Sequence, residues 1–259
     1  MTAFAVVIPA RFGSTRLPGK PLLTLAGLPM IQWVYRRGVD SEASVVVVAT
    51  DDLRIRRVAE GFGARVVMTR EDHPSGTDRC AEVVEALGWP DDGIVVNLQG
   101  DEPLMPPVLL RQVAELLAKD SQAALATLST PIVDIEELFD PNVVKVVTDG
   151  RGRAQYFSRA PIPHHRQAFG SGAERPAALP AQGLYRRHLG LYAYRVGVLK
   201  DYPTLPPSPL EAVEALEQLR ALWNGLVIAI AEAVAVPPLG VDTGADLARA
   251  TAALAREGM

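Results

Sequence analysis

The sequence contains a single cysteine, Cys80, which excludes an internal disulfide and fits a reducing compartment. Long apolar runs are also missing, since the most apolar tract, Leu226 to Val236, is too short to span a bilayer and includes Glu232. The N-terminal residues show no basic segment followed by an apolar stretch and a cleavage site, so we expect no signal peptide. These absences predict a cytoplasmic protein without membrane insertion.

An excess of positive charge is missing too. The formal net charge is −4, so we expect no broad electrostatic attraction to nucleic acid. There is no Ser-His-Asp pattern, no paired-cysteine metal site and no aromatic-and-basic platform for nucleic acid. With 259 residues, 48% of them hydrophobic, the chain can form one large α/β domain or two small ones.

What the chain does contain is a cationic loop directly after a short apolar strand, Ala5 to Ile8. The loop combines three cations with two glycines, namely Arg11, Arg16 and Lys20 with Gly13 and Gly19. A cationic loop at the carboxyl end of the first strand of an α/β sheet is where anionic ligands bind. A solvated loop without a ligand is the alternative. A Walker A loop is excluded, because five residues separate Gly13 from Gly19 and Pro21 follows the lysine.

Strands and helices alternate through the first half of the chain. Strands are expected at 45–49, 65–68 and 93–98, and helices at 30–38, after 52, from 75 and around 109–117. This alternation predicts an α/β fold with a doubly wound, mainly parallel sheet. The polar loops that begin at Arg11, Ser75 and Gln99 should then meet along one edge of the sheet.

The second half is less regular. We expect strands at 123–132, 142–148, 154–157, 184–195 and 226–234, and a long loop at 161–182. A capping box with proline at the first helical position, Ser208-Pro209-Leu210-Glu211, predicts one helix that ends near Asn224-Gly225. A C-terminal helix should begin at Asp242.

Two carboxylates are candidates for binding a metal ion. Asp101 follows a buried strand, where an uncompensated carboxylate is costly, and Mg²⁺ prefers one or two protein carboxylates with phosphates and water. Asp242 is either the second ligand or a plain helix N-cap. Glu217 either pairs with a cation such as Arg220, which we expect, or faces a polar ligand. Arg159 and His188 read as a surface cation and a satisfied histidine.

Eight ordered segments resemble the 3-deoxy-manno-octulosonate (Kdo) cytidylyltransferase family, the CMP-Kdo synthetases, and they cover nearly the whole chain. The segments are Pro9-Ala10-Arg11, Arg16 to Leu22, Ser75 to Arg79, Gln99 to Pro103, Phe157 to Pro163, His188 to Tyr192, Leu216 to Arg220 and Val241 to Thr243. The opening loop alone is typical of sugar nucleotidyltransferases in general. The later segments indicate the sugar acid.

The resemblance implies a cytosolic homodimer with the Rossmann-like nucleotidyltransferase fold, which makes CMP-Kdo and pyrophosphate from CTP and Kdo with Mg²⁺ for lipopolysaccharide assembly. It implies one domain over 1–259: a nucleotide-binding part at about 1–135, a sugar-binding and dimerisation part at about 136–225, and a C-terminal part at about 226–259. The implied catalytic residues are Arg11, Lys20, Asp101 and Asp242, the two aspartates being the metal ligands. The implied nucleotide-binding residues are Arg11, Arg16, Lys20, Ser75, Gly76 and Arg79. The implied sugar-acid-binding residues are Gln99, Arg159, His188, Tyr192, Glu217 and Gln218.

The sequence departs from the family pattern in two places. Gly244-Ala245 stands where Pro-Glu is usual, and His164-His165 stands where an aromatic and an acid are common. These departures concern the C-terminal turn and the details of sugar recognition. Three alternatives stay open beside the resemblance: a cytidylyltransferase for another acidic sugar such as 8-amino-Kdo or a sialic acid, a non-catalytic nucleotide-binding relative, and a glycosyltransferase. The last would usually have an Asp-x-Asp triplet, which this sequence lacks.

Overall fold

The computed structural model describes residues 2–13, 17–170 and 176–257, and its strands form one large sheet and a small hairpin. The strands are β1 (Ala5–Ala10), β2 (Thr24–Leu25), β3 (Leu28–Pro29), β4 (Val45–Thr50), β5 (Arg65–Met68), β6 (Ile94–Asn97), β7 (Leu125–Pro131), β8 (Lys145–Thr148), β9 (Ala154–Ser158), β10 (Arg186–Arg195) and β11 (Ile228–Glu232). The sheet order is β11-β7-β10-β6-β1-β4-β5, with β8 pairing with β10 and β9. β2 and β3 form the hairpin.

Helices connect these strands. They are α1 (Met30–Asp40), α2 (Leu53–Gly61), α3 (Gly76–Ala86), α4 (Pro107–Lys119), α5 (Ile135–Phe139), α6 (Val196–Asp201), α7 (Pro209–Glu214), α8 (Gln218–Trp223) and α9 (Gly244–Glu257), with short 3-10 turns η1 (Lys20–Leu22) and η2 (Tyr202–Thr204). Among the helices that the structure describes, none is both long and apolar enough to cross a bilayer.

The sheet is parallel on both sides of one antiparallel strand. β1 pairs in parallel with β4 and β6, β4 with β5, and β7 with β11, whereas β10 runs antiparallel to β6 and β7. The predicted α/β fold with a largely parallel central sheet is therefore confirmed. Because parallel strands end at the same edge, the loops after β1, β5 and β6 open on one side of the molecule.

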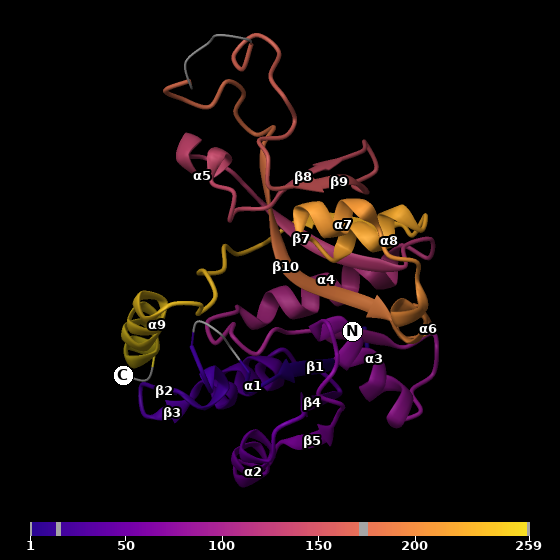
Figure 1. The fold of residues 1–259 in the computed structure, drawn as a ribbon, viewed down its shortest axis with the longest axis vertical. Helices are drawn as coiled ribbons and strands as arrows, with labels where there is room; N and C mark the ends of the chain where they lie inside the picture. Colours follow the sequence, from indigo (N-terminus) through magenta and orange to yellow (C-terminus); the bar gives the residue numbers. More distant parts are fainter. Residues whose placement is uncertain (1, 14–16, 171–175, 258–259) are drawn as a thin grey trace.

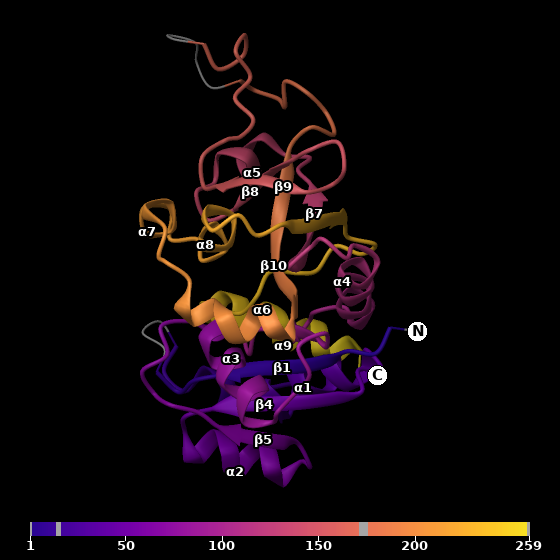
Figure 2. The same ribbon diagram turned by 90° about the vertical axis from the view of Figure 1, so that its right-hand side faces the viewer.

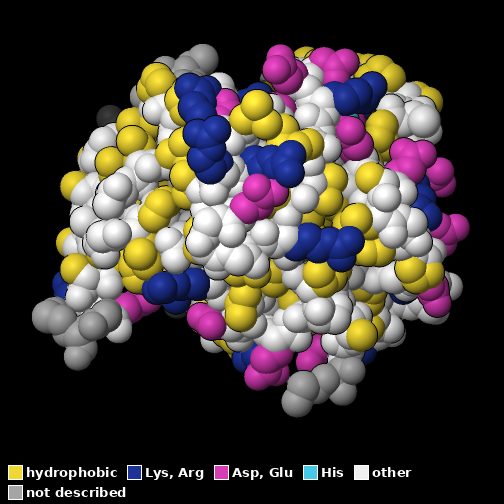
Figure 3. All heavy atoms as spheres, turned by 90° about the horizontal axis from the view of Figure 1, so that it is seen from below, with side chains coloured by type: hydrophobic (Ala, Val, Ile, Leu, Met, Phe, Trp, Pro, Cys, Tyr) yellow, Lys and Arg dark blue, Asp and Glu magenta, His cyan; other side chains and the backbone are white. Residues whose placement is uncertain are grey.

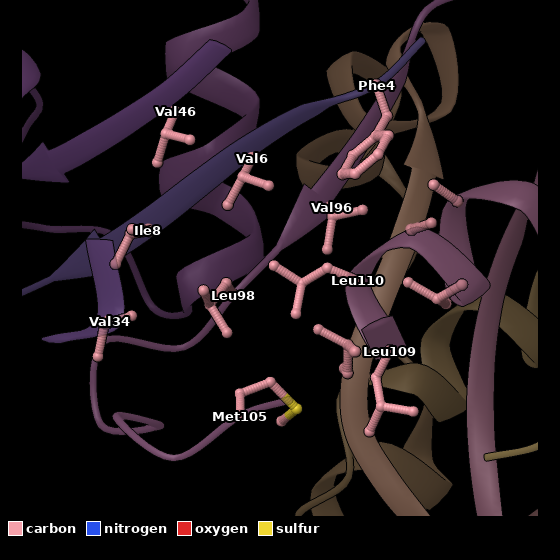
Figure 4. Packing of buried hydrophobic residues seen from close by; sticks show 14 of the residues in the cluster. Phe4, Val6, Ile8, Val34, Val46, Val96, Leu98, Met105, Leu109 and Leu110 are labelled. Carbon is pink, nitrogen blue, oxygen red and sulfur yellow. The ribbon is translucent and has the colours of Figure 1, made fainter. Parts of the chain in front are cut away.

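The two faces of the sheet are both covered, as a doubly wound fold requires. Alternate residues of β1 belong to different cores, Val6 and Ile8 to one and Ala5 and Val7 to the other. The first core contains buried residues of α1, α2, α4 and α9, and the second contains those of α3, α6 and α8. Figure 4 shows the first core, where side chains of the strands meet those of the helices.

The connection between β9 and β10 projects from the end of the molecule opposite α2, as Figures 1 and 2 both show. Its described residues, 161–170 and 176–185, contain no helix or strand, in agreement with the predicted loop. The face seen from below in Figure 3 carries basic side chains in small groups with acidic ones nearby.

The prediction of a single helix from Ser208 to Asn224 is wrong. The capping box forms as predicted, but α7 ends at Glu214 and Ala215 adopts a left-handed conformation with φ 51° before α8 begins. The break lets the Glu214 carboxylate accept hydrogen bonds from Ser158 Oγ at 2.6 Å and from the Arg159 amide at 2.9 Å. These tertiary contacts outweigh the cost of about 1–2 kcal/mol for a non-glycine residue in this region.

The remaining differences from the prediction concern short elements. The β2–β3 hairpin, α5, α6 and the two 3-10 turns carry no clear periodicity and were not predicted. Four strands begin two or three residues later than predicted: β7, β8, β10 and β11, at Leu125, Lys145, Arg186 and Ile228. The last helix, α9, begins at Gly244 and not at Asp242.

Candidate active site

The predicted polar loops meet in one cleft of about 410 Å³. The residues that line it come from the loops after β1, β5 and β6 and from the turn before α9: Pro9, Ala10, Arg11, Gly13, Lys20, Pro21, His73, Pro74, Ser75, Gly76, Arg79, Gln99, Gly100, Asp101 and Asp242. Residues separated by more than two hundred positions thus form one surface. The prediction that the loops beginning at Arg11, Ser75 and Gln99 converge is confirmed.

Two glycines allow the loops to approach closely. A Cβ atom on Gly100 would lie 2.7 Å from the Pro9 carbonyl oxygen, which belongs to the backbone of β1. A Cβ atom on Gly76 would lie 3.2 Å from Pro9 Cγ and 3.3 Å from Gln99 Oε1. At Gly100 a side chain would require the β1 backbone to move, whereas at Gly76 the Pro9 and Gln99 side chains would have to shift by a few tenths of an ångström.

We expect Gly100→Ala to lower the free energy of unfolding by about 1–3 kcal/mol, because the new methyl group must push the β1 backbone away. Thermal or urea denaturation would measure the change. Gly150→Ala is the matched control, since a Cβ atom there meets nothing within 4 Å. Equal stability of the two variants would contradict the close packing of these loops.

The centre of the cleft is an ammonium group between two carboxylates. Lys20 Nζ donates to Asp101 Oδ2 at 2.7 Å, to Asp242 Oδ1 at 3.1 Å and to the Val241 carbonyl oxygen at 2.9 Å. Burial alone would lower the pKa of Lys20, but Asp101 and then Asp242 outweigh it and the pKa is raised. The three side chains therefore meet as a charged cluster in the folded chain.

A third carboxyl group, which the sequence analysis did not single out, lies beside this cluster. Burial, followed by the charges of Asp101 and Asp242, raises the pKa of Glu102 to about 8. Gly240 makes room for it, because a Cβ atom there would lie 2.9 Å from Glu102 Oε1. The only signal in the sequence was the position of Glu102 in the Gln99–Pro103 segment, directly after the metal candidate Asp101.

The donor set fits a divalent cation held mainly by its substrate. The Asp101 and Asp242 oxygens both reach one Lys20 nitrogen, so a single small cation can contact both carboxylates. Within the described ranges no group of three or more His, Cys, Asp or Glu side chains could hold a metal ion. Mg²⁺ favours such an arrangement, in which one or two carboxylates bind the ion and phosphate oxygens and water complete its coordination shell.

The first turn of α3 forms the wall of the cleft opposite the carboxylates. Ser75 caps the helix by accepting from the Asp78 amide. Its Oγ also lies 2.6 Å from Asp78 Oδ2 and 3.1 Å from Glu217 Oε1. One hydroxyl proton can be donated to only one of these carboxyl groups at a time. Burial raises the pKa of Glu217, while hydrogen bonds from Thr77 and Ser75 work in the opposite direction.

The expected ion pair between Glu217 and Arg220 is wrong. Arg220 instead forms a two-point pair with Glu211, with nitrogen–oxygen distances of 2.6 and 2.9 Å. The break at Ala215 turns Glu217 away from its own helix and toward Ser75. Glu217 therefore touches the wall of the cleft, as a polar ligand-facing residue would.

Arg79 lines the cleft, but its side chain is buried. Its guanidinium donates to Asp51 Oδ2 at 2.7 Å and also to Thr69 Oγ1. The charge of Arg79 is thus used within the protein, where it joins α3 to the loops after β4 and β5. Two of its five N–H donors are used in these contacts.

Two of the residues implied for the sugar acid, His188 and Tyr192, belong to β10, and Tyr192 packs in the same core as α3. Ring contacts run from His188 to Tyr192 at 5.3 Å and from Tyr192 to Tyr194 at 5.8 Å. Tyr194 lies within 3.4 Å of the Thr77 hydroxyl, in the first turn of α3. Burial lowers the pKa of His188 to about 3, so the ring is neutral, and the buried Tyr192 hydroxyl has no hydrogen-bond partner in the described part of the chain.

Of the other residues implied for the sugar acid, Gln99 lines the cleft and donates to Asn97 Oδ1 at 3.2 Å. Gln218 is buried at the start of α8. Arg159 does not line the cleft, and its guanidinium donates to the carbonyl oxygens of Glu214, Pro141 and Ala215. These three donors fix the plane of the guanidinium.

Arg11 and His73 also belong to the cleft. Arg11 lines the cleft and is exposed, so its guanidinium can reach a ligand. Arg16, predicted to bind the nucleotide, lies outside the described residues. His73 lines the cleft and was missed by the sequence analysis, although a titratable side chain just before the α3 N-cap was a usable signal.

Comparison with known proteins gives one consistent result. A family model described as cytidylyltransferase matches residues 5–230. A protein of Hahella chejuensis named 3-deoxy-manno-octulosonate cytidylyltransferase is 56% identical over 99% of both chains. One of the same name from Halorhodospira halophila is 58% identical over 95% of this chain and 94% of its own.

Solved structures agree. A CMP:2-keto-3-deoxy-manno-octonic acid synthetase complexed with CTP aligns with a TM-score of 0.87 and 44% identity, covering 98% of this chain and all of its own. A thymidylyltransferase from Bacillus anthracis aligns with a TM-score of 0.65 at 17% identity, covering 98% of this chain and 96% of its own, and supports the fold alone.

Proposed function

Because the chain belongs to the cytidylyltransferase family, we propose that it transfers the cytidylyl group of CTP to the anomeric hydroxyl of Kdo. The products are CMP-Kdo and pyrophosphate. In this reaction the hydroxyl oxygen bonds to the α-phosphorus while the bond from that phosphorus to the β-phosphate oxygen breaks. The hydroxyl proton leaves to solvent and the pyrophosphate takes the electron pair of the broken bond.

One observation carries the proposal: Lys20, Asp101 and Asp242, from three distant segments, form a single charged cluster in a cleft. Negative charge develops on the pyrophosphate as the bond breaks, and fixed cations stabilise it. Lys20 and the exposed Arg11 lie on the loop after β1, where both can contact phosphate oxygens. The α3 wall, with its capped N-terminus, orients the rest of the nucleotide.

We propose that Asp101 and Asp242 hold Mg²⁺ together with the triphosphate. When bound, the ion neutralises phosphate charge and lowers the pKa of a hydroxyl that it contacts. This chemistry removes the need for a strong protein base. With Mg²⁺ bound, the Lys20 ammonium would move from the two carboxylates to the phosphate oxygens, because the same carboxylate oxygens cannot fully coordinate the metal ion and also accept hydrogen bonds from Lys20.

The experiment is a pyrophosphate-release assay of the purified protein with CTP and Kdo, with and without Mg²⁺. We expect turnover only when all three are present. Parallel assays with 8-amino-Kdo and a sialic acid test the other acidic sugars, which the named relatives do not favour. Absence of pyrophosphate in every mixture would favour a non-catalytic nucleotide-binding relative.

Arg159 is proposed to bind the carboxylate of the sugar acid. Three of its five N–H donors are held by backbone carbonyls, which leaves two for a ligand. We expect Arg159→Ala to raise KM for Kdo about 10- to 100-fold, with little change in KM for CTP. Steady-state kinetics with each substrate varied would measure both constants, with exposed Arg151→Ala as the control. An equal rise in both would place Arg159 elsewhere.

We also propose a cytoplasmic homodimer. Exposed apolar residues lie just outside the ends of β7, β10 and β11, namely Val133, Leu184 and Val234. Each lies two residues beyond the Arg186–Pro131 pair or the Arg186–Glu232 ion pair, which hold these strand ends together. Burying these apolar side chains in an interface between two copies of the chain is favourable. We expect Val234→Asp to shift sedimentation from dimer toward monomer, and an unchanged dimer would exclude this surface.

A further inference from the structure

His73 is a side chain of the cleft that the proposed reaction does not use. It belongs to the loop between β5 and α3, two residues before the helix cap at Ser75. Its side chain is only 5% exposed, although it lines the cleft. A buried ring facing a ligand cleft is fixed in place before any ligand binds.

The partner of His73 determines which ring nitrogen carries a proton. Nε2 contacts the carboxylate of Glu82 on α3, which also accepts from the Arg70 amide at 3.1 Å. Burial works against ionisation of Glu82, yet the hydrogen bonds from His73 and Arg70 prevail and lower its pKa. An ionised carboxylate only accepts, so Nε2 is the donor.

The other ring nitrogen is then available to a ligand. In a neutral imidazole whose Nε2 carries the proton, Nδ1 is a hydrogen-bond acceptor. Among the residues that the structure describes, no side chain or backbone group hydrogen-bonds to Nδ1. Nδ1 is not one of the fully buried polar atoms without a hydrogen-bond partner, so part of its surface is accessible. The cleft therefore contains an oriented hydrogen-bond acceptor.

The sheet order places this acceptor away from the phosphate-binding groups. Lys20 and Asp101 follow β1 and β6, which are neighbours, whereas His73 follows β5, the far edge strand. A nucleotide with its phosphates at Lys20 extends its nucleoside toward another wall of the cleft. Pro74, next to His73 in the cleft lining, provides apolar surface there, as the face of a pyrimidine ring requires.

We infer that His73 determines the choice of nucleobase by accepting a hydrogen bond from the 4-amino group of cytosine at Nδ1. Uracil has a carbonyl oxygen at the same position, and two acceptors repel each other. The inference rests on the proposed function, since it concerns how that site distinguishes CTP from UTP. Glu82 is a positioning residue, because it fixes the proton on Nε2.

Two variants separate this role from a structural one. His73→Phe and His73→Asn both lose the contact with Glu82, but the asparagine amide can still present a polar atom where Nδ1 was. Calorimetric titration with CTP and with UTP, each with Mg²⁺ and without Kdo, gives the dissociation constants. Glu85→Gln, on the exposed face of the same helix, is the control.

We expect His73→Phe to weaken CTP binding about 10- to 100-fold and to leave UTP binding unchanged. His73→Asn should bind CTP within about threefold of the parent protein and bind UTP more tightly, because its amide can turn to donate. A parallel loss for CTP and UTP in both variants would overturn the inference and leave His73 with a structural role. Since binding is measured without Kdo, a failure of pyrophosphate release would contradict the proposed function separately.

Discussion

Replacement of Asp101 by alanine is expected to reduce turnover by about 10³-fold or more while the fold survives. Asp101 is one of the two carboxylates on Lys20, and it follows β6 directly above the sheet. Without it, a divalent cation keeps only Asp242 as a protein ligand in this cluster. The pyrophosphate-release assay at saturating Mg²⁺ would measure the loss.

The fold should tolerate this change because the cluster is partly open to solvent. The Asp101 side chain is 34% exposed, and Lys20 keeps Asp242 and the Val241 carbonyl as partners. We therefore expect a melting temperature within a few degrees of the parent protein. Asp92→Ala, at an exposed turn, is the matched control. Undiminished turnover of the Asp101 variant would remove this residue from the site.

Replacement of Lys20 by methionine is expected to have two opposite effects. Turnover should fall about 10²- to 10³-fold, since the leaving pyrophosphate loses a fixed cation. Binding of Mn²⁺ without nucleotide should instead tighten, because Asp101 and Asp242 no longer have an internal ammonium between them. The first effect is measured by pyrophosphate release and the second by calorimetry.

The control is Lys200→Met, which removes another lysine that pairs with an aspartate, Asp91, at 2.7 Å outside the cleft. It should change neither turnover nor Mn²⁺ binding. Weaker Mn²⁺ binding by the Lys20 variant would show that its ammonium does not occupy the place of the metal ion.

The sequence was sufficient for the parts of the fold that depend on local pattern. Runs such as 45–48 and 94–96 are buried strands because β-branched residues fill both faces. Their alternation with amphipathic helices determines where strands end, and hence that Lys20, Gln99 and Asp101 share an edge. The proximity of Asp101 to Lys20 could be predicted because both follow strands that end at that edge. The position of Asp242 beside them could be predicted only from the family resemblance.

What the sequence could not predict depends on contacts between distant segments. Ala215 has no local reason to adopt a left-handed conformation, and only the partners of Glu214 on β9 explain it. The pairing of Arg220 with Glu211 and of Arg79 with Asp51 likewise requires the packed structure. His73 escaped notice because its significance comes from Glu82, on the next helix.

The central claim is that the Asp101 and Asp242 carboxylates, which contact Lys20 Nζ, hold the divalent cation that accompanies the triphosphate. The most direct measurement is anomalous diffraction from crystals grown with Mn²⁺ and a non-hydrolysable CTP analogue. The account predicts a manganese peak bonded to both aspartates, with Lys20 Nζ moved onto phosphate oxygens. Manganese bound elsewhere, with Lys20 still between the two carboxylates, would contradict it.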